Sequence, residues 1–594
     1  MENKLRSEMD PAFQWDLKPI FESDDAWRRA LAECDAAVKA LASLPGTLKA
    51  SQEGLKAGLD QIYATSEAAE RVYEYAMLKK YQDGGDTAGQ EMAGLATSLV
   101  VALQTATAFV DPELLTIPEV QLNQWLSAEG IQPYRHIIEN VVRARAHTLD
   151  HNGERLMAML GDAAQTPENV FEMLSEVEMR FPNIRDEKGE EVPLTHASFG
   201  VYRESRSQSV RKAAFAAYFG EFGRYINTLT AAYAGSVKLD CFNADARGYD
   251  SACAAALFGN NVPVSLYDNL IAAVHDAFPA MRRYIELRKH RLGLDALNLY
   301  DLYTPIVDDV EIDMPYGRAR DLVRQALKPL GEDYQRLLDR AFDERWIDVY
   351  ENRGKHAGAF SMSVYGVHPY VLLNYADKLD DAFTLAHELG HSMHSFFSDR
   401  AQGYANHDYA IFVAEVASTV NEVLLTRYLL SVETDPARRA MLLNHFLEGF
   451  RTTIFRQTLF AEFERDAHAL YQSGTPLTAE ALNKLYHDLN AKYYEGCVIN
   501  DFCDVEWARI PHFYSAFYVY QYATGFSSAV AIADRILKTG DASDYLRFLS
   551  TGGSDYPIEE LKLAGVDLTT PDPIRDALKA FDDAIGQLEE LLGE

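Results

Sequence analysis

The stretch TLAHELGHSMHSFF, residues 384–397, contains residue types that bind zinc and activate water. In a helix, His387 and His391 lie one turn apart on the same face, so both can reach one ion. Glu388 is rotated by about 100° from His387, which places it poorly as a ligand but well to contact a water on the metal. This H-E-x-x-H pattern is typical of zinc hydrolases, in which the glutamate is the general base.

The helix that carries these residues is expected to be largely buried. Its flanking side chains are apolar: Phe383, Leu385, Leu389 and Met393. Two solvated histidines beside a surface glutamate would be the alternative, but buried polar groups without a metal are costly. His394 returns to the face of His387 but lies about 10.5 Å further along the axis, whereas ligand atoms lie about 2 Å from a zinc ion. We expect His394 to make a supporting or core hydrogen bond instead.

A catalytic zinc site keeps three protein ligands and an open position, so the third ligand must come from another element. The next strongly helical segment, residues 411–425 (IFVAEVASTVNEVLL), is apolar almost throughout but contains Glu415 and Glu422. A carboxylate in such a helix needs a partner, and a metal is a suitable one. The two glutamates are seven residues apart and share a face, so spacing alone does not identify the ligand.

Most of the chain is predicted to be helical, because apolar residues recur every three or four positions through residues 24–180. Residues 182–200 contain a D-E-K-G turn between short extended runs and predict a hairpin. We take this hairpin as the boundary between an N-terminal helical lobe (1–190) and a catalytic domain (191–594). Residues 354–375 predict a pair of strands directly before the H-E-x-x-H helix. The expected fold is therefore mainly α, with a small antiparallel sheet beside the candidate site.

The run from Tyr370 to Tyr375 is expected to be the edge strand of this sheet. An edge strand offers unpaired backbone N–H and C=O groups, to which an extended peptide can add as another strand. The residues expected to bind substrate in this way are Tyr370, Val371, Leu372, Asn374 and Tyr375. A strand that only packs the sheet is the alternative.

Composition and charge limit the classes of protein. The 594 residues carry a formal net charge of −33, which opposes binding to nucleic acid or to an anionic membrane surface. The N-terminus has no signal-peptide core, and no window of the sequence is expected to approach a transmembrane span. The five cysteines are scattered without a C-x-x-C pair, which indicates neither a disulfide framework nor a thiolate zinc site. A reducing cytoplasm is the expected setting.

Several motifs resemble those of one group of peptidases. The stretch H-E-L-G-H-S-M-H, followed 24 residues past His391 by E-V-A-S, resembles the thimet oligopeptidase superfamily of zinc peptidases, in particular its oligoendopeptidase F branch. GKHAGAFS and HPYVLLNY precede the helix as in that branch. The resemblance covers roughly residues 115–585, with 115–185 similar to the N-terminal domain of the branch. It implies that Glu415 is the third ligand of one zinc ion per chain. Glu422 is then either a supporting residue of the site or simply a buried polar residue.

The segment IPHFYSAFYVYQYATG, residues 510–525, also resembles that branch. If it is helical, Tyr514, Tyr518 and Tyr522 share one face, and by spacing alone an aromatic packing stripe is the more common interpretation. The family uses a histidine and tyrosines from this region to bind substrate and stabilise the transition state. The resemblance therefore implies such roles for His512, Tyr518 and Tyr522, without identifying which hydroxyl faces the oxyanion.

The resemblance implies a two-lobed zinc endopeptidase whose deep channel admits short, unstructured peptides. A related zinc carboxypeptidase or dipeptidyl carboxypeptidase is one alternative, and such an enzyme needs a cation or strong donor for the terminal carboxylate. A non-catalytic, zinc-stabilised scaffold that binds peptides is a second alternative. The glutamate of the H-E-x-x-H pattern disfavours the scaffold, because a structural zinc site needs no general base and fills all four positions.

Overall fold

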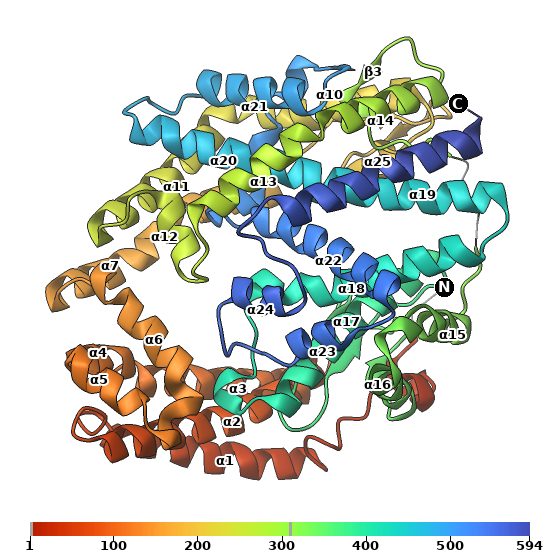
Figure 1. Ribbon diagram of the computed structural model, residues 1–594. Coiled ribbons are helices and arrows are strands. Elements are labelled where there is room, and N and C mark those ends of the chain that lie inside the picture. The colour runs from red at the N-terminus through yellow and green to blue at the C-terminus, as the bar shows by residue number, and fades with distance from the viewer. Residues whose placement is uncertain (1–3, 308–309, 311, 594) are drawn as a thin grey trace. The chain divides into compact units, whose positions relative to one another are not determined.

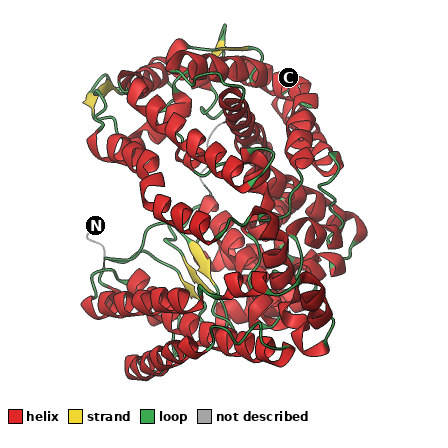
Figure 2. Cartoon of the chain, turned by 90° about the vertical axis from the view of Figure 1, so that its left-hand side faces the viewer, coloured by secondary structure: helices red, strands yellow, loops and turns green. Residues whose placement is uncertain are grey.

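The structure is a computed structural model that describes residues 4–307, 310 and 312–593. It is mainly α-helical, with a few short strands between the helices (Figure 2). The chain forms two compact units, each built from three stretches of sequence. Unit 1 comprises Met1–Ala146, Glu311–Tyr428 and Ile532–Val566, and unit 2 comprises His147–Val310, Leu429–Ala531 and Asp567–Glu594.

This division differs from the predicted N-terminal lobe at 1–190 and catalytic domain at 191–594. Residues 1–146 belong to unit 1, whereas residues 147–190 belong to unit 2. Each unit therefore contains chain segments from both sides of the predicted boundary. A single cut in the sequence does not describe this arrangement, because compact units can form from segments that are distant along the chain.

The helices of unit 1 come from all three of its segments (Figure 1). They are α1 (Asp24–Ala40), α2 (Gln52–Gln82), α3 (Thr87–Thr107), α4 (Val110–Thr116), α5 (Glu119–Leu126), α6 (Arg135–Arg143), α15 (Tyr316–Ala326), α16 (Glu332–Asp343), α17 (Leu379–Ala401), α18 (Ile411–Val432, mostly in this unit), α23 (Ser543–Leu549) and α24 (Pro557–Leu563).

The N-terminal helices of unit 1 pack around a core that reaches the sheet. The hydroxyl of Ser23 caps α1 by accepting a hydrogen bond from the Ala26 backbone. One turn on, the fully buried Trp27 donates its indole N–H to the carbonyl of Val72 on α2, at 2.8 Å. The same core includes Tyr370 of the sheet. Burial of each large apolar side chain stabilises this unit by roughly 1.5–3 kcal/mol.

The sheet of unit 1 has three strands in the order β4 (Ile347–Asp348), β6 (Tyr370–Leu372), β5 (Phe360–Met362). Strand β5 is antiparallel to β6, as predicted for this stretch, but β4 adds a parallel partner on the other side of β6. The prediction that Tyr370 begins an edge strand is therefore wrong. Its strand is the fully buried centre of the sheet, and β5 lies at the edge.

The sequence did not reveal β4, because its two residues lie far from the strand pair and are too short to show alternation. The backbone N–H of Val371 donates to the carbonyl of Trp346 at 2.9 Å, and that of Leu373 donates to Asp348 at 2.8 Å. These bonds use the side of β6 that faces away from β5. An incoming peptide has no free edge at β6.

Unit 1 also contains an apolar helical stretch that sequence analysis did not expect. Thr87–Thr116 has a mean hydropathy of 1.6 over its most apolar window and is long enough to cross a membrane by length and composition. The prediction that the sequence has no such stretch is wrong on that count. Its side chains Met92, Ala96 and Leu99 are buried in the core that α3 shares with α1 and α2.

The helices of unit 2 are α7 (His151–Ala164), α8 (Thr166–Glu172), α9 (His196–Tyr202), α10 (Gln208–Arg224), α11 (Ile226–Arg247), α12 (Ala252–Phe258), α13 (Val264–Asp276), α14 (Phe278–Arg291), α19 (Pro436–Phe450), α20 (Arg456–Gln472), α21 (Ala479–Tyr493), α22 (Tyr520–Thr539, which begins in this unit) and α25 (Asp572–Leu592). The predicted hairpin is confirmed as β1 (Ile184–Arg185) and β2 (Glu191–Val192), which pair antiparallel. Strands β3 (Leu297–Asn298) and β7 (Cys497–Val498) pair parallel.

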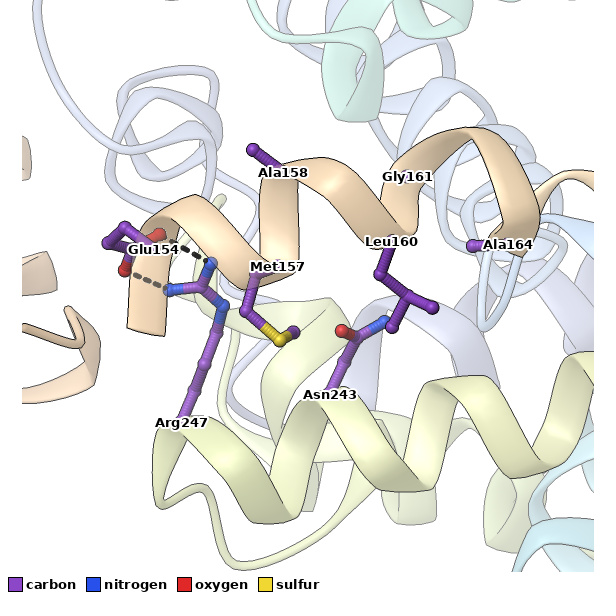
Figure 3. Close-up of a pocket in the computed structure, with 8 residues that line it drawn as sticks. All are labelled: Glu154, Met157, Ala158, Leu160, Gly161, Ala164, Asn243 and Arg247. Atoms are coloured by element: carbon purple, nitrogen blue, oxygen red, sulfur yellow. Dashed lines mark hydrogen bonds and ion pairs between the residues drawn. The ribbon is translucent and has the colours of Figure 1, made fainter. Parts of the chain in front are cut away.

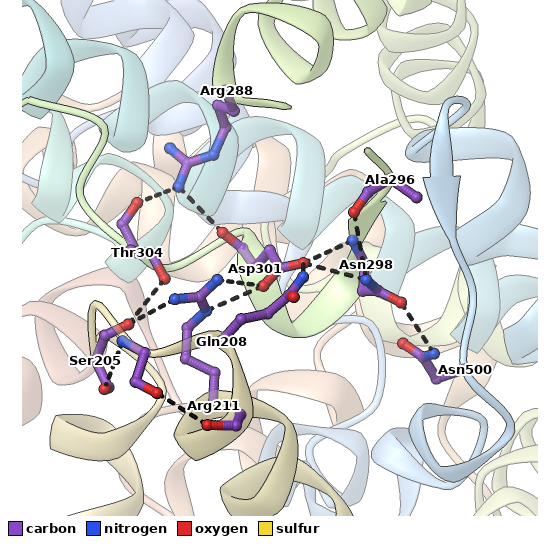
Figure 4. A network of polar contacts seen from close by, with 11 residues as sticks. Ser205, Gln208, Arg211, Arg288, Ala296, Asn298, Asp301, Thr304 and Asn500 are labelled. Carbon is purple, nitrogen blue, oxygen red and sulfur yellow. Dashed lines mark hydrogen bonds and ion pairs between the residues drawn. The ribbon is translucent and has the colours of Figure 1, made fainter. Parts of the chain in front are cut away.

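A buried polar network stabilises the interior of unit 2 (Figure 4). The guanidinium of Arg211 on α10 forms an ion pair with Asp301 at 2.5 Å, and both side chains are buried. Arg288 on α14 donates to the carbonyl of Thr304 at 2.6 Å, three residues past Asp301. Loss of one member of such a buried pair typically costs about 3–5 kcal/mol. The network therefore fixes α10 and α14 to the segment around residue 301.

A cavity of about 380 Å³ lies between α7 and α11 in the same unit (Figure 3). Its charged lining groups, Glu154 and Arg247, neutralise each other through two hydrogen bonds of 2.8 and 3.0 Å. The rest of the lining consists of small or apolar side chains and the amide of Asn243. This composition offers no cluster of metal ligands.

Candidate metal centre

Helix α17 carries the H-E-x-x-H residues, and its start is fixed by a carboxylate. The Asp381 side chain accepts hydrogen bonds from the backbone N–H groups of Ala376 and Lys378, at 3.0 and 2.9 Å. Asp380 and Asp381 also place negative charge at the positive end of the helix dipole. The helix then continues without interruption through His387 and His391 to Ala401.

Helices α17 and α18 approach each other closely at Gly390, between the two histidines. A Cβ at this position would lie 2.5 Å from the Cα of Ser418 and 2.7 Å from the carbonyl oxygen of Ala417. Four residues earlier on α17, the carbonyl of Ala386 accepts a hydrogen bond from the amide of Asn421, at 2.9 Å. Only glycine permits this approach, and the approach brings the acidic residues of α18 toward the histidines.

Three ligand atoms converge where the helices meet. The Nε2 atoms of His387 and His391 are 3.2 Å apart, and the Oε2 atom of Glu415 lies 3.4 Å from the first and 3.7 Å from the second. Ligands that bind one tetrahedral zinc at about 2.0–2.2 Å lie about 3.3–3.6 Å from one another. Among the described residues, this is the only group of three or more His, Cys, Asp and Glu arranged to hold a metal. The three residues fit a zinc ion and leave a fourth position for water.

Glu422 lies on the other side of the His387 ring. Its carboxylate accepts a hydrogen bond from Nδ1 of that histidine, which leaves Nε2 directed at the ligand group. The geometry thus separates the two glutamates that spacing alone left open: Glu415 reaches the ligand atoms, and Glu422 orients His387. A carboxylate in this position fixes the tautomer and the orientation of a metal-binding imidazole.

The electrostatics of the site depend on this packing. Burial lowers the pKa of His387, but the hydrogen bond and the charge of Glu422 outweigh it and raise the pKa to about 8. Burial and the charge of His387 lower the pKa of His391 to about 4. Because a metal binds the neutral imidazole, ligation and protonation compete at both rings.

Glu388 is 7% exposed, and its pKa is raised to about 7. Burial is the main cause; His387 opposes the shift, and the charges of Glu415 and Glu422 add to it. A carboxyl group with a pKa near neutrality can accept a proton and release it again in the same cycle. The position therefore suits a general base beside the ligand group.

His394 is fully buried and lies outside the ligand group, as the axial distance predicts. The predicted hydrogen bond is wrong: among the described residues, neither ring nitrogen has a hydrogen-bond partner. Instead the ring stacks on Tyr409, with centroids 3.6 Å apart and planes inclined by 7°. Burial lowers the pKa of His394 to about 3, so the ring is neutral and packs as an aromatic side chain.

A cavity of about 260 Å³ lies beside the start of α17, within unit 1. Of the predicted substrate-binding residues, Asn374 and Tyr375 line it, whereas Tyr370, Val371 and Leu372 do not. The Asn374 amide also donates to the carbonyl of Gly358, at 2.8 Å. The lining residues that were not predicted to bind substrate are Gly358, Ala359, Leu373, Asp381 and Thr384. Thr384 could have been found, because it lies three residues before His387 on the same helix.

His512, Tyr518 and Tyr522 lie together in unit 2. The His512 ring is 6.1 Å from that of Tyr518 and 5.9 Å from that of Tyr522, and the two tyrosine rings are 5.6 Å apart. The Tyr522 hydroxyl and Nε2 of His512 form a hydrogen bond of 3.3 Å. The structure therefore clusters the three residues that the resemblance selected. Their chemical role stays a prediction.

Tyr514 does not join this cluster, because the segment is not one continuous helix. Residues Pro511–Tyr514 form a 3-10 turn, and α22 begins only at Tyr520. Between them Phe517 has a positive φ of 56°. The shared helical face expected for Tyr514, Tyr518 and Tyr522 is therefore absent, and Tyr514 stacks on Phe171 with centroids 4.8 Å apart.

Residues 201–580 match the family model Peptidase family M3, and residues 113–181 match the model Oligopeptidase F. The chain belongs to peptidase family M3. Its branch within that family is oligopeptidase F, and the gap between the two matches contains the predicted boundary near residue 190. Membership makes the chain a metallopeptidase, which rules out the non-catalytic scaffold.

Relatives in this M3 branch match the chain over nearly its whole length. Oligopeptidase PepF of Bacillus subtilis (strain 168) is 43% identical over 99% of this chain and 88% of its own length. An oligoendopeptidase F homolog of Lactococcus lactis (subsp. lactis, strain IL1403) is 39% identical over 99% of both chains. The crystal structure of oligoendopeptidase-F from Enterococcus faecium is 36% identical, with a TM-score of 0.73, over 96% of this chain and 99% of that one.

Proposed function

We propose that this M3 peptidase is a zinc-dependent oligoendopeptidase that hydrolyses internal bonds of short, unstructured peptides. The observation that carries the proposal is the convergence of His387, His391 and Glu415, with ligand atoms 3.2 to 3.7 Å apart. The names and high identity of the relatives support oligopeptides as the substrate class. We further propose one zinc ion per chain and a two-lobed fold that encloses a substrate channel.

The mechanism assigns roles to the residues around the ligand group. Zinc held by His387, His391 and Glu415 would supply Lewis-acid activation of a water molecule. Glu388 accepts the proton of the attacking water on its carboxylate and then donates it to the nitrogen of the leaving amine. Glu422 keeps Nε2 of His387 free by accepting the hydrogen bond from Nδ1. Family resemblance supports His512, Tyr518 and Tyr522 as donors to the substrate and to the developing oxyanion.

Strand β5 is the proposed docking edge for the substrate backbone. It is the outer strand of the order β4-β6-β5, and its three residues are half-buried. The Ser361 hydroxyl of β5 lies 2.8 Å from the Ser392 hydroxyl of α17, directly after His391. A peptide added to this edge as a further strand would use main-chain hydrogen bonds, which tolerate many side chains.

The decisive experiment measures turnover of a quenched-fluorescence peptide by wild type, by chelator-treated protein and by Glu388→Gln. The glutamine variant keeps the three ligands, so it should bind zinc while turnover falls by roughly 10²–10⁴-fold. Restored activity on adding zinc to the treated protein is the matching control. A glutamine variant that binds zinc and cleaves at the wild-type rate would refute the mechanism.

Product mapping separates the endopeptidase from the related carboxypeptidase or dipeptidyl carboxypeptidase. A peptide of about ten residues is long enough to extend on both sides of the cut. Internal cleavage is expected, and capping the C-terminal carboxylate as an amide should leave the rate nearly unchanged. Stepwise loss of residues from the C-terminus, abolished by the amide, would favour the alternative.

We also propose a cytoplasmic location. All five cysteines are free, and Cys34, Cys241, Cys253 and Cys503 are buried. Unpaired thiols suit a reducing compartment. Fractionation of cells that express the full chain should recover activity in the cytosolic fraction, and recovery with membranes would contradict the proposal.

A further inference from the structure

The aromatic cluster of unit 2 depends on a backbone conformation that its sequence disfavours. Phe517 has φ of 56° and is one of four non-glycine residues with positive φ in the described part of the chain. For an L-residue with a bulky side chain this region is sterically unfavourable, and it persists only where surrounding contacts enforce it. Contacts around Phe517 must therefore stabilise this backbone conformation.

The main polar contact of this residue is a buried carboxyl group. The Phe517 backbone N–H donates to Oε1 of Glu464 at 2.6 Å. Glu464 lies in the middle of α20 and is fully buried. Among the described residues Glu464 forms no ion pair, and its Oε2 has no hydrogen-bond partner. Conventional roles in stability, as an ion-pair member or a helix cap, do not apply to it.

The surroundings favour the neutral form of this carboxyl group. Burial, together with the charge of Asp240 on α11, raises its pKa well above the usual value, against the opposing hydrogen bond from Phe517. His468 lies one turn further along α20. Its Nδ1 is hydrogen-bonded to the backbone carbonyl of Glu464, and its Nε2 to the carboxylate of Asp240. A neutral carboxyl group still offers its carbonyl oxygen as an acceptor, as a carboxamide does.

Aromatic contacts hold the rest of the turn. The Phe517 ring is buried, with its centroid 4.6 Å from that of His468 and 5.8 Å from that of Tyr267. Four residues earlier, Phe513 is buried against Phe463 of α20, at 5.2 Å. Helix α20 thus binds the segment through two rings and one backbone hydrogen bond. The side chains of His512, Tyr518 and Tyr522 remain at least partly exposed.

The turn at Phe517 determines how these three side chains meet. It separates the 3-10 turn that carries His512 from helix α22. A helical φ at Phe517 would extend α22 backwards and carry His512 away from the Tyr522 hydroxyl, which lies 3.3 Å from its ring. The left-handed residue is therefore the point at which the chain changes direction to form the cluster.

We propose that Glu464 is a positioning residue, which holds Phe517 in its left-handed conformation and thereby sets the arrangement of His512, Tyr518 and Tyr522. This inference rests on the proposed function, in which those three residues bind the substrate and stabilise the transition state. Glu464 itself contacts neither substrate nor metal ligand in this assignment. It acts through the backbone of the turn.

The test compares two substitutions of Glu464 in the full-length enzyme loaded with zinc. Glu464→Gln keeps a carbonyl acceptor for the Phe517 N–H, so kcat should stay within roughly threefold of wild type. Glu464→Met has a similar length but no comparable acceptor, so kcat should fall by roughly 10²-fold, as misplacement of catalytic groups by about 1 Å can do. Zinc content should be unchanged in both variants.

A double-mutant cycle with Tyr522→Phe distinguishes positioning from general destabilisation. If Glu464 acts through the cluster, the loss caused by Glu464→Met should be much smaller in the Tyr522→Phe background than in wild type. Glu462→Met is the matched control, because it removes a buried carboxylate of the same helix that pairs with His275 and Lys492 instead. It should lower the melting temperature without coupling to Tyr522→Phe.

Three outcomes would overturn the proposal. Additive losses in the cycle, or a Gln variant as impaired as the Met variant, would show that Glu464 does not act by accepting the Phe517 hydrogen bond. Full turnover in Tyr522→Phe, Tyr518→Phe and His512→Ala would instead refute the roles assigned to the cluster, and the positioning role with them. If Glu464→Met does not fold, the test is amide hydrogen exchange over residues 510–520 in Glu464→Gln. The proposal requires this variant to retain wild-type protection there, and a loss of protection would overturn it.

Discussion

The metal ligands and the aromatic cluster are positioned in different ways. His387, His391 and Glu415 lie on two uninterrupted helices, and ordinary helical spacing directs them to one point once the helices are close. His512 and Tyr522 lie on either side of a non-helical turn whose pivot, Phe517, has an unfavourable backbone. The first arrangement requires a close approach between elements, and the second requires a local conformation enforced from outside.

This contrast explains which changes should damage each region. The helix pair depends on a small residue where the helices meet, so added volume at Gly390 is the sensitive change. The aromatic cluster depends on an acceptor for one backbone N–H, so loss of Glu464 is the sensitive change there. Either change should reduce turnover. Added volume at Gly390 should act by weakening zinc binding, whereas loss of Glu464 should lower kcat at unchanged zinc content.

The largest effect should separate the two glutamates of α18. Glu415→Ala removes a ligand atom, so zinc binding and turnover should both be lost, with a fall in turnover of roughly 10³-fold or more. Glu422→Leu removes only the acceptor that orients His387, so zinc affinity should fall by roughly 10- to 100-fold, and excess zinc should restore most of the activity. Zinc titration with parallel rate measurements checks both. Equal losses in the two variants would contradict the assignment of Glu415 as ligand.

A smaller effect is expected from Gly390→Ala, which tests the close approach directly. The new Cβ would lie 2.5 Å from the Cα of Ser418, a backbone atom that cannot move aside alone. The helices must separate, which should cost roughly 1–3 kcal/mol of stability and weaken zinc binding. In the matched control, Gly94→Ala on α3, the Cβ meets nothing within 4 Å, and better helix propensity should stabilise the protein by up to about 1 kcal/mol.

Thermal unfolding and zinc titration of both variants distinguish volume from propensity. If Gly390→Ala and Gly94→Ala behave alike, the helices do not require a glycine at their contact. The positions of the metal ligands would then not depend on the close packing of α17 against α18 at Gly390.

The same contrast explains how much the sequence could predict. The helical character, the two histidines and the base followed from periodicity and spacing, because a helix converts sequence distance into direction. The choice between Glu415 and Glu422 needed either a family resemblance or the structure, since both share one face of α18. The sequence did not show that β6 is the central strand of its sheet. Its partner β4 lies over twenty residues earlier, and only tertiary packing brings Ile347 beside Val371.

The irregular segment was the least predictable part of the site. Spacing suggested that Tyr514 would join Tyr518 and Tyr522, but a turn with positive φ breaks the periodicity. Phe517 gives no local signal for such a turn, because glycine and asparagine are the residues that usually adopt it. The deciding interaction comes from Glu464, which is 53 residues away in the sequence.

A still smaller effect should distinguish the tyrosines of that segment. Tyr522→Phe removes the hydroxyl that bonds to His512 and should lower kcat by roughly 10-fold or more, with unchanged zinc content. Tyr514→Phe keeps the stacking ring against Phe171 and should leave kcat within about twofold, since its face is not shared with the cluster. Steady-state kinetics on one peptide substrate compares them. A larger loss in Tyr514→Phe would restore the continuous-helix interpretation.

The smallest effect concerns the connection between α17 and α18, which helps to fix the two ligand helices. His407 forms a hydrogen bond with Asp399 at 2.9 Å and lies 3.7 Å from Glu70. Burial opposes its protonation, but the hydrogen bond to Asp399 and the charges of Asp399 and Glu70 raise its pKa to about 9, and the charge of Asp408 also interacts with it. Because the folded pKa exceeds the unfolded value of about 6.5, charged His407 stabilises the fold fully below about pH 6.5, and this contribution is lost as the pH rises through about 9.

The melting temperature of wild type should therefore decline between about pH 6.5 and pH 9 more steeply than that of His407→Gln, whose side chain does not titrate. The difference should amount to a few degrees in a chain of this size, since about 1 kcal/mol shifts the midpoint of a large domain by roughly 2–4 °C. His445→Gln on α19 of unit 2 is a control that leaves this connection intact. Parallel pH profiles for wild type and His407→Gln would show that Asp399 and Glu70 do not hold a charged imidazole, and that the ligand helices are joined by packing alone.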